Sequence, residues 1–298
     1  MKQHAVPKFY LRRFVPSTGE HLLWAYARDS GRARRVSPRS ATAESHLYSV
    51  RGSDGSWDDT LERQLQVIES AAADPLKRLS SGRSLRAKDR ECVSVLMGAM
   101  VLRVKAPRRT AEEQADSLRT PQGTLKFLET RSILPKILPP EVIAAYKARV
   151  LLTGRGAEVP RQFHLVNFVA RAKRHGDLIS KMTWNVYIAS HDDFFVTSDN
   201  PAFARRPGHL LDPGLVGIGR ADLGVELGFP LCRDSFLLAS WRKGTDQTAK
   251  ADGKKVWELN SRTVVSALTY VFSPCRSTKL ESLVQRFAGF RIAYPRIV

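Results

Sequence analysis

At residues 194–201 the chain reads Phe-Phe-Val-Thr-Ser-Asp-Asn-Pro, an apolar strand that runs into a polar break. Pro201 cannot continue a strand ladder, and its ring keeps Asn200 extended, so the strand is expected to end here. A buried strand end is a rigid mount for a carboxylate, which makes Asp199 the leading candidate for a catalytic group. The simpler interpretation is an Asx-type turn, in which Asp199 and Asn200 bond the nearby backbone.

The composition fits a protein with a sizeable core. The chain has 298 residues, of which 43% are hydrophobic, enough for one large domain or two intimate lobes. No run of about 18 apolar residues predicts a membrane span, and the N-terminus lacks the apolar stretch of a signal peptide. The three cysteines are far apart, which favours neither a disulfide framework nor a zinc site. The sequence therefore predicts a reduced, cytoplasmic protein.

The charge balance indicates a polyanionic partner. The formal net charge is +19 and the pI is about 10.3. A chain of this charge attracts polyanions, among which nucleic acid is abundant in the cytosol. We therefore expect DNA as the partner, with RNA as an open alternative. A merely basic protein without a nucleic-acid role is the simpler reading, and the oligomeric state is left open.

The order of the predicted elements indicates an α+β fold. It consists of an N-terminal hairpin, a helical middle lobe, a strand-rich second half and a C-terminal helix. We predict a single domain over 1–298 with a possible helical insertion over 107–180. The expected elements are a hairpin (22–36), helices (59–80, 86–106, 110–119, 140–152, 161–175 and 257–269) and strands (182–189, 194–197, 225–231 and 236–241).

A second dense motif stands at the N-terminus, where residues 4–14 read His-Ala-Val-Pro-Lys-Phe-Tyr-Leu-Arg-Arg-Phe. One interpretation is an ordered arm whose aromatic side chains fill the core while His4 stays exposed. The functional interpretation is that the arm crosses the site and brings His4 and Tyr10 close to Asp199.

Local motifs for several enzyme classes are absent. The chain has no Walker loop, Gly-x-Gly-x-x-Gly, His-Glu-x-x-His, Gly-x-Ser-x-Gly or Pro-Cys-x-x-Cys. No metal site and no cofactor are therefore predicted. Glu62 and Glu69 lie one heptad apart on an expected helix, either as a solvated face or facing the core. Arg103 ends an apolar helix and is the charge that we most expect to be buried, where Glu62 could pair with it.

The order of these segments carries a family resemblance. The residues concerned are His4-x-x-Pro7-x-x-Tyr10-Leu11-x-x-Phe14, the helix 62–69, Arg103, Trp184, 197–201, Pro230-Leu231 and Asn260. In this order they resemble, over nearly the whole chain, a prokaryotic family catalogued as domain of unknown function 4238. The resemblance implies that the N-terminal motif and the Ser-Asp-Asn-Pro motif belong to one site. Such genes look like bacterial accessory or defence genes, which favours an enzyme or toxin acting on nucleic acid.

Our leading hypothesis is a metal-free DNA glycosylase that flips and excises bases, with the modified bases of phage DNA as natural targets and antiviral defence as its role. This hydrolase needs a carboxylate to stabilise an oxocarbenium-like sugar, groups that hold the leaving base, and a basic surface for the phosphates. The predicted catalytic residues are Asp199, Asn200 and His4. The predicted substrate-binding residues are Tyr10, Thr197, Ser198, Arg13 and Arg103.

Three alternatives stay open. A metal-dependent nuclease would arrange Asp199, Glu62 and His4 around Mg²⁺. A nucleic-acid-binding or partner-binding protein without catalysis would use the Ser-Asp-Asn-Pro break only as a turn. An enzyme acting on a small molecule is the remaining possibility.

Overall fold

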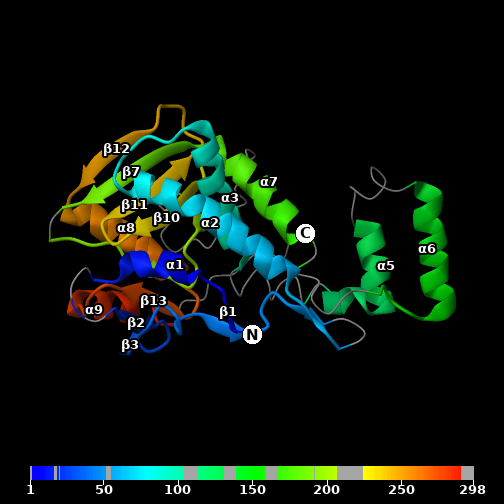
Figure 1. Cartoon of the computed structure of the whole chain (residues 1–298). Coiled ribbons are helices and arrows are strands. Elements are labelled where there is room, and N and C mark those ends of the chain that lie inside the picture. The colour runs from blue at the N-terminus through cyan, green and yellow to red at the C-terminus, as the bar shows by residue number, and fades with distance from the viewer. Residues whose placement is uncertain are drawn as a thin grey trace. The chain divides into compact units, whose positions relative to one another are not determined.

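The structure is a computed structural model (Figure 1). It describes residues 2–16, 19, 21–51, 55–103, 113, 115–130, 139–158, 165, 167–190, 192–206 and 224–289. The chain divides into two compact units. The larger lies within Met1–Ala106 and Asn167–Pro295, and the smaller within Pro107–Val166.

A five-stranded sheet forms the centre of the larger unit. Its strand order is β12-β7-β11-β10-β9, and only the β12–β7 pair is parallel. β10 and β11 are apolar and buried along nearly their whole length, as central strands covered on both faces should be. The strands are β7 (Thr183–Ala189), β9 (Phe203–Arg205), β10 (Glu226–Cys232), β11 (Ser235–Ser240) and β12 (Gln247–Ala251).

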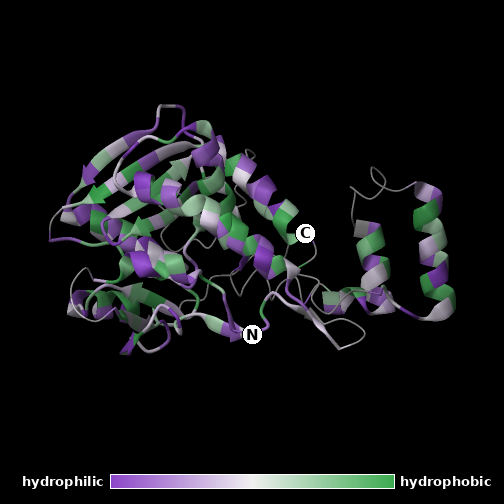
Figure 2. Ribbon diagram, in the orientation of Figure 1, coloured by the Kyte–Doolittle hydropathy of each residue, from purple (hydrophilic) through white to green (hydrophobic). Residues whose placement is uncertain are grey.

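Helices cover both faces of this sheet (Figure 1). The helices α2 (Thr60–Ser80), α3 (Ala87–Arg103) and α7 (Phe168–Ser180) share the main apolar core with one face. Helix α8 (Gly253–Ser266) packs its apolar residues on the other. Helix α2 is amphipathic, with hydrophobic and hydrophilic residues alternating around its turns in Figure 2.

A second sheet joins the two ends of the chain. Its order is β3-β2-β13-β8, and all of its pairs are antiparallel. Helix α9 contributes to the apolar cluster that covers one face of this sheet. The elements are β2 (Leu23–Ala27), β3 (Ala33–Val36), β8 (Thr197–Ser198), β13 (Tyr270–Ser273) and α9 (Thr278–Arg286).

Short elements precede α2. Strand β1 pairs with β4, and β5 pairs with β6. They are β1 (Lys2–His4), α1 (Lys8–Leu11), η1 (Arg12–Phe14), β4 (Ala43–Ser45), β5 (Val50–Arg51) and β6 (Trp57–Asp58).

The smaller unit contains the helices α5 (Pro121–Thr130) and α6 (Pro140–Thr153). Helix α6 begins with a proline, whose missing N–H costs nothing in the first turn. It ends at Gly154, which adopts the left-handed conformation with a φ of 60°. Of the helix predicted over 110–119, residues 113 and 115–118 are helical, and residues 110–112 and 114 lie outside the described residues.

The α+β fold predicted from the sequence is confirmed, including the hairpin, α2, α3 and the central strands. Several details differ. The helix expected over 161–175 is α7, which begins at Phe168, and the sequence does not predict α5 or β12. Only Thr197 and Ser198 of the strand expected over 194–197 pair in a sheet. The helix expected to reach 269 ends at Ser266, because the amides of Leu268 and Thr269 bind Asp199 instead of helix carbonyls. Helix α9 was not predicted, although Ser277 is a typical N-cap residue for it.

Among the described residues, no helix is both long enough and apolar enough to cross a bilayer.

Candidate functional site

The Ser-Asp-Asn-Pro break is tied to the segment that follows α8. Asp199 accepts hydrogen bonds from the amides of Leu268 at 2.8 Å and Thr269 at 2.7 Å, one on each carboxylate oxygen. The side-chain amide of Asn200 donates to the carbonyl of Ser266 at 2.8 Å. The hydroxyl of Ser198 accepts from the backbone amide of Asn200 at 3.1 Å. The polar side chains at this strand end thus bind the backbone of the chain itself.

Burial raises the pKa of Asp199, against the opposing effect of its backbone hydrogen bonds. Its charge acts in turn on Arg28, where burial lowers the pKa and Asp199 opposes that shift. Because each carboxylate oxygen of Asp199 accepts a hydrogen bond from a backbone amide, the side chain holds the strand end and the segment after α8 together. This geometry favours a structural role for Asp199 and Asn200, and their catalytic roles stay a prediction.

Tyr10 joins the N-terminal motif to the strand end inside the core. Its side chain is fully buried, and its hydroxyl donates to the carbonyl of Pro230 at 2.7 Å. The hydroxyl of Thr197 lies 2.9 Å away, so Thr197 donates to Tyr10. The ring stacks on Phe229, with centroids 5.3 Å apart. Burial raises the pKa of Tyr10. The two sequence motifs therefore meet, in the core of the larger unit.

Arg13 fixes the same N-terminal segment to two other elements. Its Nε donates to the carbonyl of Leu231 at 2.7 Å, and its Nη2 donates to the hydroxyl of Ser80 at 2.7 Å. Burial lowers the pKa of Arg13. Its donors serve to hold η1 against β10 and the end of α2.

A different group of charges lies at the end of the α2–α3 hairpin that is opposite its connecting turn. Arg103, the last described residue of α3, is only 4% exposed. Its Nη2 lies 2.6 Å from the Oε1 of Glu69, and its guanidinium lies 5.3 Å from the ring centroid of Tyr48. The Nε and Nη1 of Arg103 are buried without a hydrogen-bond partner in the described part of the chain. Burial of the charge of Arg103 is confirmed, and Glu69 is the acid that pairs with it.

Glu62 lies about two helical turns before Glu69 on the same side of α2. Its Oε2 is buried and has no hydrogen-bond partner among the described residues. Burial raises the pKa of Glu62, which the positive charge of Arg103 opposes and the negative charge of Glu69 reinforces. We call Glu62, Glu69 and Arg103 the carboxylate–arginine cluster. Both glutamates are half-buried, so solvent reaches them.

His4 lies near this cluster. Its Nε2 is 2.9 Å from the carbonyl oxygen of Arg39, and since a carbonyl only accepts, Nε2 carries a proton and donates. The electrostatic effect of His4 lowers the pKa of Glu62, although burial dominates. No hydrogen bond or ion pair described in the structure joins His4 to Asp199. The structure thus groups His4 with Glu62, and Tyr10 with Thr197.

Potential metal ligands do not cluster in the described residues. No group of three or more His, Cys, Asp or Glu side chains there could hold a metal ion. Asp199, Glu62 and His4, which the nuclease alternative requires, do not form such a group.

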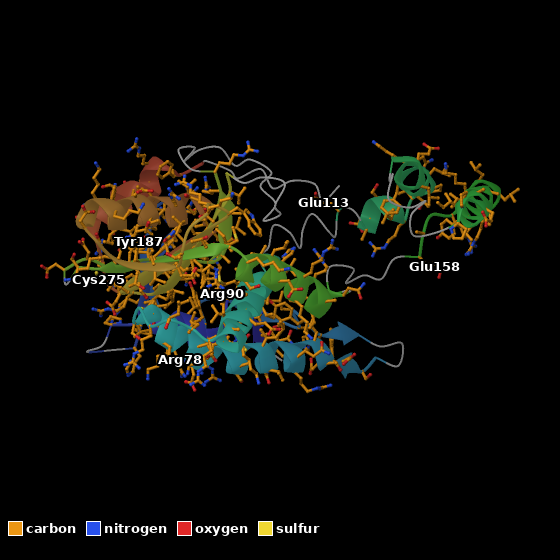
Figure 3. The ribbon with its side chains drawn as sticks, turned by 90° about the horizontal axis from the view of Figure 1, so that it is seen from above. Arg78, Arg90, Glu113, Glu158, Tyr187 and Cys275 are labelled. Atoms are coloured by element: carbon orange, nitrogen blue, oxygen red, sulfur yellow. The ribbon has the colours of Figure 1, made fainter. Side chains whose placement is uncertain are left out.

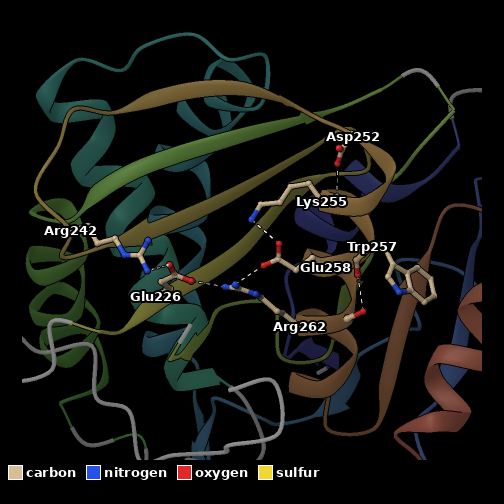
Figure 4. A network of polar contacts seen from close by, with 8 residues as sticks. Glu226, Arg242, Asp252, Lys255, Trp257, Glu258 and Arg262 are labelled. Atoms are coloured by element: carbon tan, nitrogen blue, oxygen red, sulfur yellow. Dashed lines mark hydrogen bonds and ion pairs between the residues drawn. The ribbon is translucent and has the colours of Figure 1, made fainter. Parts of the chain in front are cut away.

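A second charged network pins α8 to the sheet (Figure 4). The carboxylate of Glu226 on β10 is buried and lies 2.6 Å from Arg262 on α8 and 3.6 Å from the more exposed Arg242. Arg262 also pairs with Glu258, which pairs with Lys255. Burial raises the pKa of Glu258, but the hydrogen bond from Lys255 and the charge of Arg262 bring it below its ordinary value. The acids of this network are all paired, whereas in the carboxylate–arginine cluster the buried oxygen of Glu62 has no hydrogen-bond partner among the described residues.

Sequence reasoning missed Tyr48, whose ring lies beneath Arg103. No periodicity marks it, because it follows a short strand in an irregular stretch. The sequence suggests Glu62 as the partner of Arg103, whereas the structure pairs Arg103 with Glu69, one heptad further along α2.

Comparisons with known proteins give one match. No curated protein and no solved structure shows significant similarity to the chain. One family matches residues 2–277 and therefore includes the N-terminal motif, the carboxylate–arginine cluster and the Ser-Asp-Asn-Pro break. The chain belongs to this family, described as Protein of unknown function (DUF4238).

Proposed function

We propose that this protein is a hydrolase acting on nucleic acid, most concretely a DNA glycosylase that cleaves the bond between a base and its sugar. The carboxylate–arginine cluster is the observation that carries the proposal. It offers two carboxyl groups in different environments, which is the arrangement that assigns separate acid and base roles in glycoside chemistry. The net charge of +19 supports a polyanionic substrate.

The two glutamates suit different steps. Glu62 keeps its proton to higher pH than a solvated glutamate, so it suits protonation of the departing base. Glu69, held by Arg103 as an ion pair, suits stabilisation of the positive sugar and removal of a proton from the attacking water. In the balanced reaction, the carbon–nitrogen bond breaks, water adds to the sugar carbon, and the base leaves with the proton from Glu62. Exchange with solvent then returns Glu62 and Glu69 to their starting states.

His4 is placed to assist. Its Nε2 proton is donated to the carbonyl oxygen of Arg39, and its electrostatic effect lowers the pKa of Glu62. We propose that His4 adjusts the proton affinity of Glu62, whereas the sequence suggested direct contact with the base. Tyr10 and Thr197 would support the site from the core, because their hydroxyls are paired with each other and with Pro230.

The biological setting follows from the same chemistry. A glycosylase reads a flipped base in a closed pocket, so a modified phage base is a suitable target, and defence against phage in a reduced cytoplasm is the proposed role.

The test is an alkali assay. The purified protein is incubated in EDTA with plasmid DNA and with phage DNA that carries modified bases, and half of each sample is then treated with alkali. Strand breaks that appear only after alkali mark abasic sites, as a glycosylase predicts. Breaks that require Mg²⁺ and no alkali would instead support the nuclease. DNA that stays intact under both conditions while still binding would support the non-catalytic alternative.

Matched variants assign the chemistry to the cluster. Glu62→Gln should lower the rate of base release by about 10²–10⁴-fold, the usual contribution of a general acid. Glu258→Gln is the control, since Glu258 is also a half-buried, charged helix residue but belongs to the α8 network. Equal losses in both variants, or an unchanged rate in Glu62→Gln, would exclude Glu62 as the acid.

A further inference from the structure

The closed end of the α2–α3 hairpin is strongly basic. Residues 77–90 contain six Lys or Arg and one acidic residue, a net charge of +5 (6 − 1) in this segment. The cations are Lys77, Arg78, Arg83, Arg86, Lys88 and Arg90, and the single acid is Asp89. Arg78 and Arg90 are labelled in Figure 3, on α2 and α3 respectively.

The acidic groups at this turn are already paired. Asp89 lies 2.7 Å from Arg78, and Asp246, before β12, pairs with Arg90. The other four cations are exposed and form no ion pair with any described residue. They are Lys77, Arg83, Arg86 and Lys88. The charge of this turn is therefore directed at solvent instead of at neighbouring carboxylates.

Two further lysines flank the turn on other elements. Arg90 donates to the carbonyls of Ser180 and Met182, which brings the exposed Lys181 next to the start of α3. On the other side, the hydroxyl of Thr248 donates to the carbonyl of Gly82 at 3.3 Å. Lys250, two residues along β12, shares the face of Thr248 and is exposed.

We propose that this basic turn, composed of the four exposed cations with Lys181 and Lys250, binds the phosphate backbone of the nucleic acid. The inference rests on the nucleic-acid substrate proposed above and adds where that substrate is held. Clustered exposed cations without carboxylate partners are the electrostatic footprint that phosphate contacts need.

The hairpin also sets a distance between this surface and the carboxylate–arginine cluster. Helix α2 has 21 residues, with Glu62 in its first turn and the basic turn after its last. At 1.5 Å per residue this is about 30 Å. A duplex that contacts both ends would span roughly nine base pairs at 3.4 Å each. We infer that shorter duplexes bind and react poorly because they reach only one end.

The test measures how salt affects binding. Affinity for a fluorescein-labelled 30-base-pair duplex is measured by anisotropy over a range of NaCl concentrations. The variant that combines Lys77→Gln, Arg83→Gln, Arg86→Gln and Lys88→Gln should make the negative slope of log affinity against log salt shallower by about 3–4, or about 0.9 for each lost contact. The control combines Arg12→Gln, Arg32→Gln, Lys254→Gln and Arg286→Gln, four exposed cations elsewhere, and should leave the slope nearly unchanged.

Several outcomes would overturn the inference. They are a larger change of slope in the control variant, equal affinity for duplexes of 6 and 20 base pairs, and binding to phosphatidylserine vesicles in place of DNA. The proposed function fails separately. If the basic-turn variant loses binding while the native protein never releases a base, the binding surface is supported and the hydrolase function is excluded. If Glu62→Gln abolishes base release while the basic-turn variant binds normally, the hydrolase function is supported and the binding surface is excluded.

Discussion

At the scale of single residues, the two candidate carboxylates have opposite surroundings. Asp199 has a backbone amide on each oxygen, whereas Glu62 has a buried oxygen without a partner among the described residues. A buried polar atom that is left unsatisfied costs stability, so proteins keep such atoms chiefly where function needs them. This contrast is why the proposed acid is Glu62, although the sequence pointed first to Asp199.

The pH dependence of base release should report Glu62. Because burial raises the pKa of Glu62 and the protonated form is the active one, kcat/KM should fall as pH rises through that raised value. The falling limb should lie above the ordinary pKa of a glutamate. It should disappear in the residual activity of Glu62→Gln, whose amide does not titrate. A limb that persists unchanged in Glu62→Gln would assign it to another group.

Asp199 gives a prediction about stability. Asp199→Ala should lower the free energy of unfolding by about 1–3 kcal/mol, because the amides of Leu268 and Thr269 lose their acceptor. Asp199→Asn keeps one oxygen acceptor and should cost less. Urea denaturation of both variants checks this. A catalytic Asp199 would instead give Asp199→Asn a native stability with base release abolished.

At the scale of elements, α3 and α7 approach each other through glycine. A Cβ at Gly98 would lie 2.3 Å from the backbone oxygen of Ala172, and one at Gly176 would lie 2.9 Å from the Cα of Val95. Both obstacles are backbone atoms, so an added methyl group forces the helices apart. The close approach brings α7 onto the hairpin that carries the carboxylate–arginine cluster.

Gly98→Ala should therefore destabilise the protein by about 1–3 kcal/mol, although alanine favours a helix over glycine. Gly244→Ala is the matched control, because its Cβ would meet nothing closer than 3.9 Å. That change should stay within about 0.5 kcal/mol. Thermal or urea unfolding of the two variants measures both effects. If the two helices could move apart without loss, Gly98→Ala would be neutral or stabilising.

The elements were largely predictable from the sequence, whereas the site was not. Apolar periodicity located α2, and continuous apolar runs located α3 and the central strands, since each depends on its own residues. The contact of Tyr10 with Thr197, and the grouping of Glu69 with Arg103 and Tyr48, depend on how distant segments pack. The end of α8 could not be placed from its own residues, because Asp199, far away in sequence, binds the amides of Leu268 and Thr269.

At the scale of the whole molecule, stability should depend on pH through His175. Burial lowers its pKa to about 4, assisted by the charges of Arg171 and Arg174. Between about 6.5 and 4 the unfolded chain therefore takes up a proton that the folded protein does not. Folding stability should fall over this range as pH decreases, by about 2–3 kcal/mol from this group.

The measurement compares urea unfolding of the native protein and His175→Gln at pH 7 and at pH 4. The difference between the two proteins isolates His175, because the remaining groups titrate equally in both. The native protein should lose more stability on acidification than the variant. Equal losses would show that His175 takes up its proton in the folded state as readily as in the unfolded one.

The pairing of β2 with β13 constrains how this protein is made. Ala27 and Tyr270 are direct partners, so the second sheet cannot close until residue 270 has left the ribosome. At about 5–20 residues per second, β2 waits for roughly 10–50 s before its partner is synthesised. During translation the amides that hold Asp199 are also still missing, so nascent chains that stop before residue 268 should remain protease-sensitive. The segment from residue 268 to residue 273 thus decides whether the residues translated before it form a folded unit.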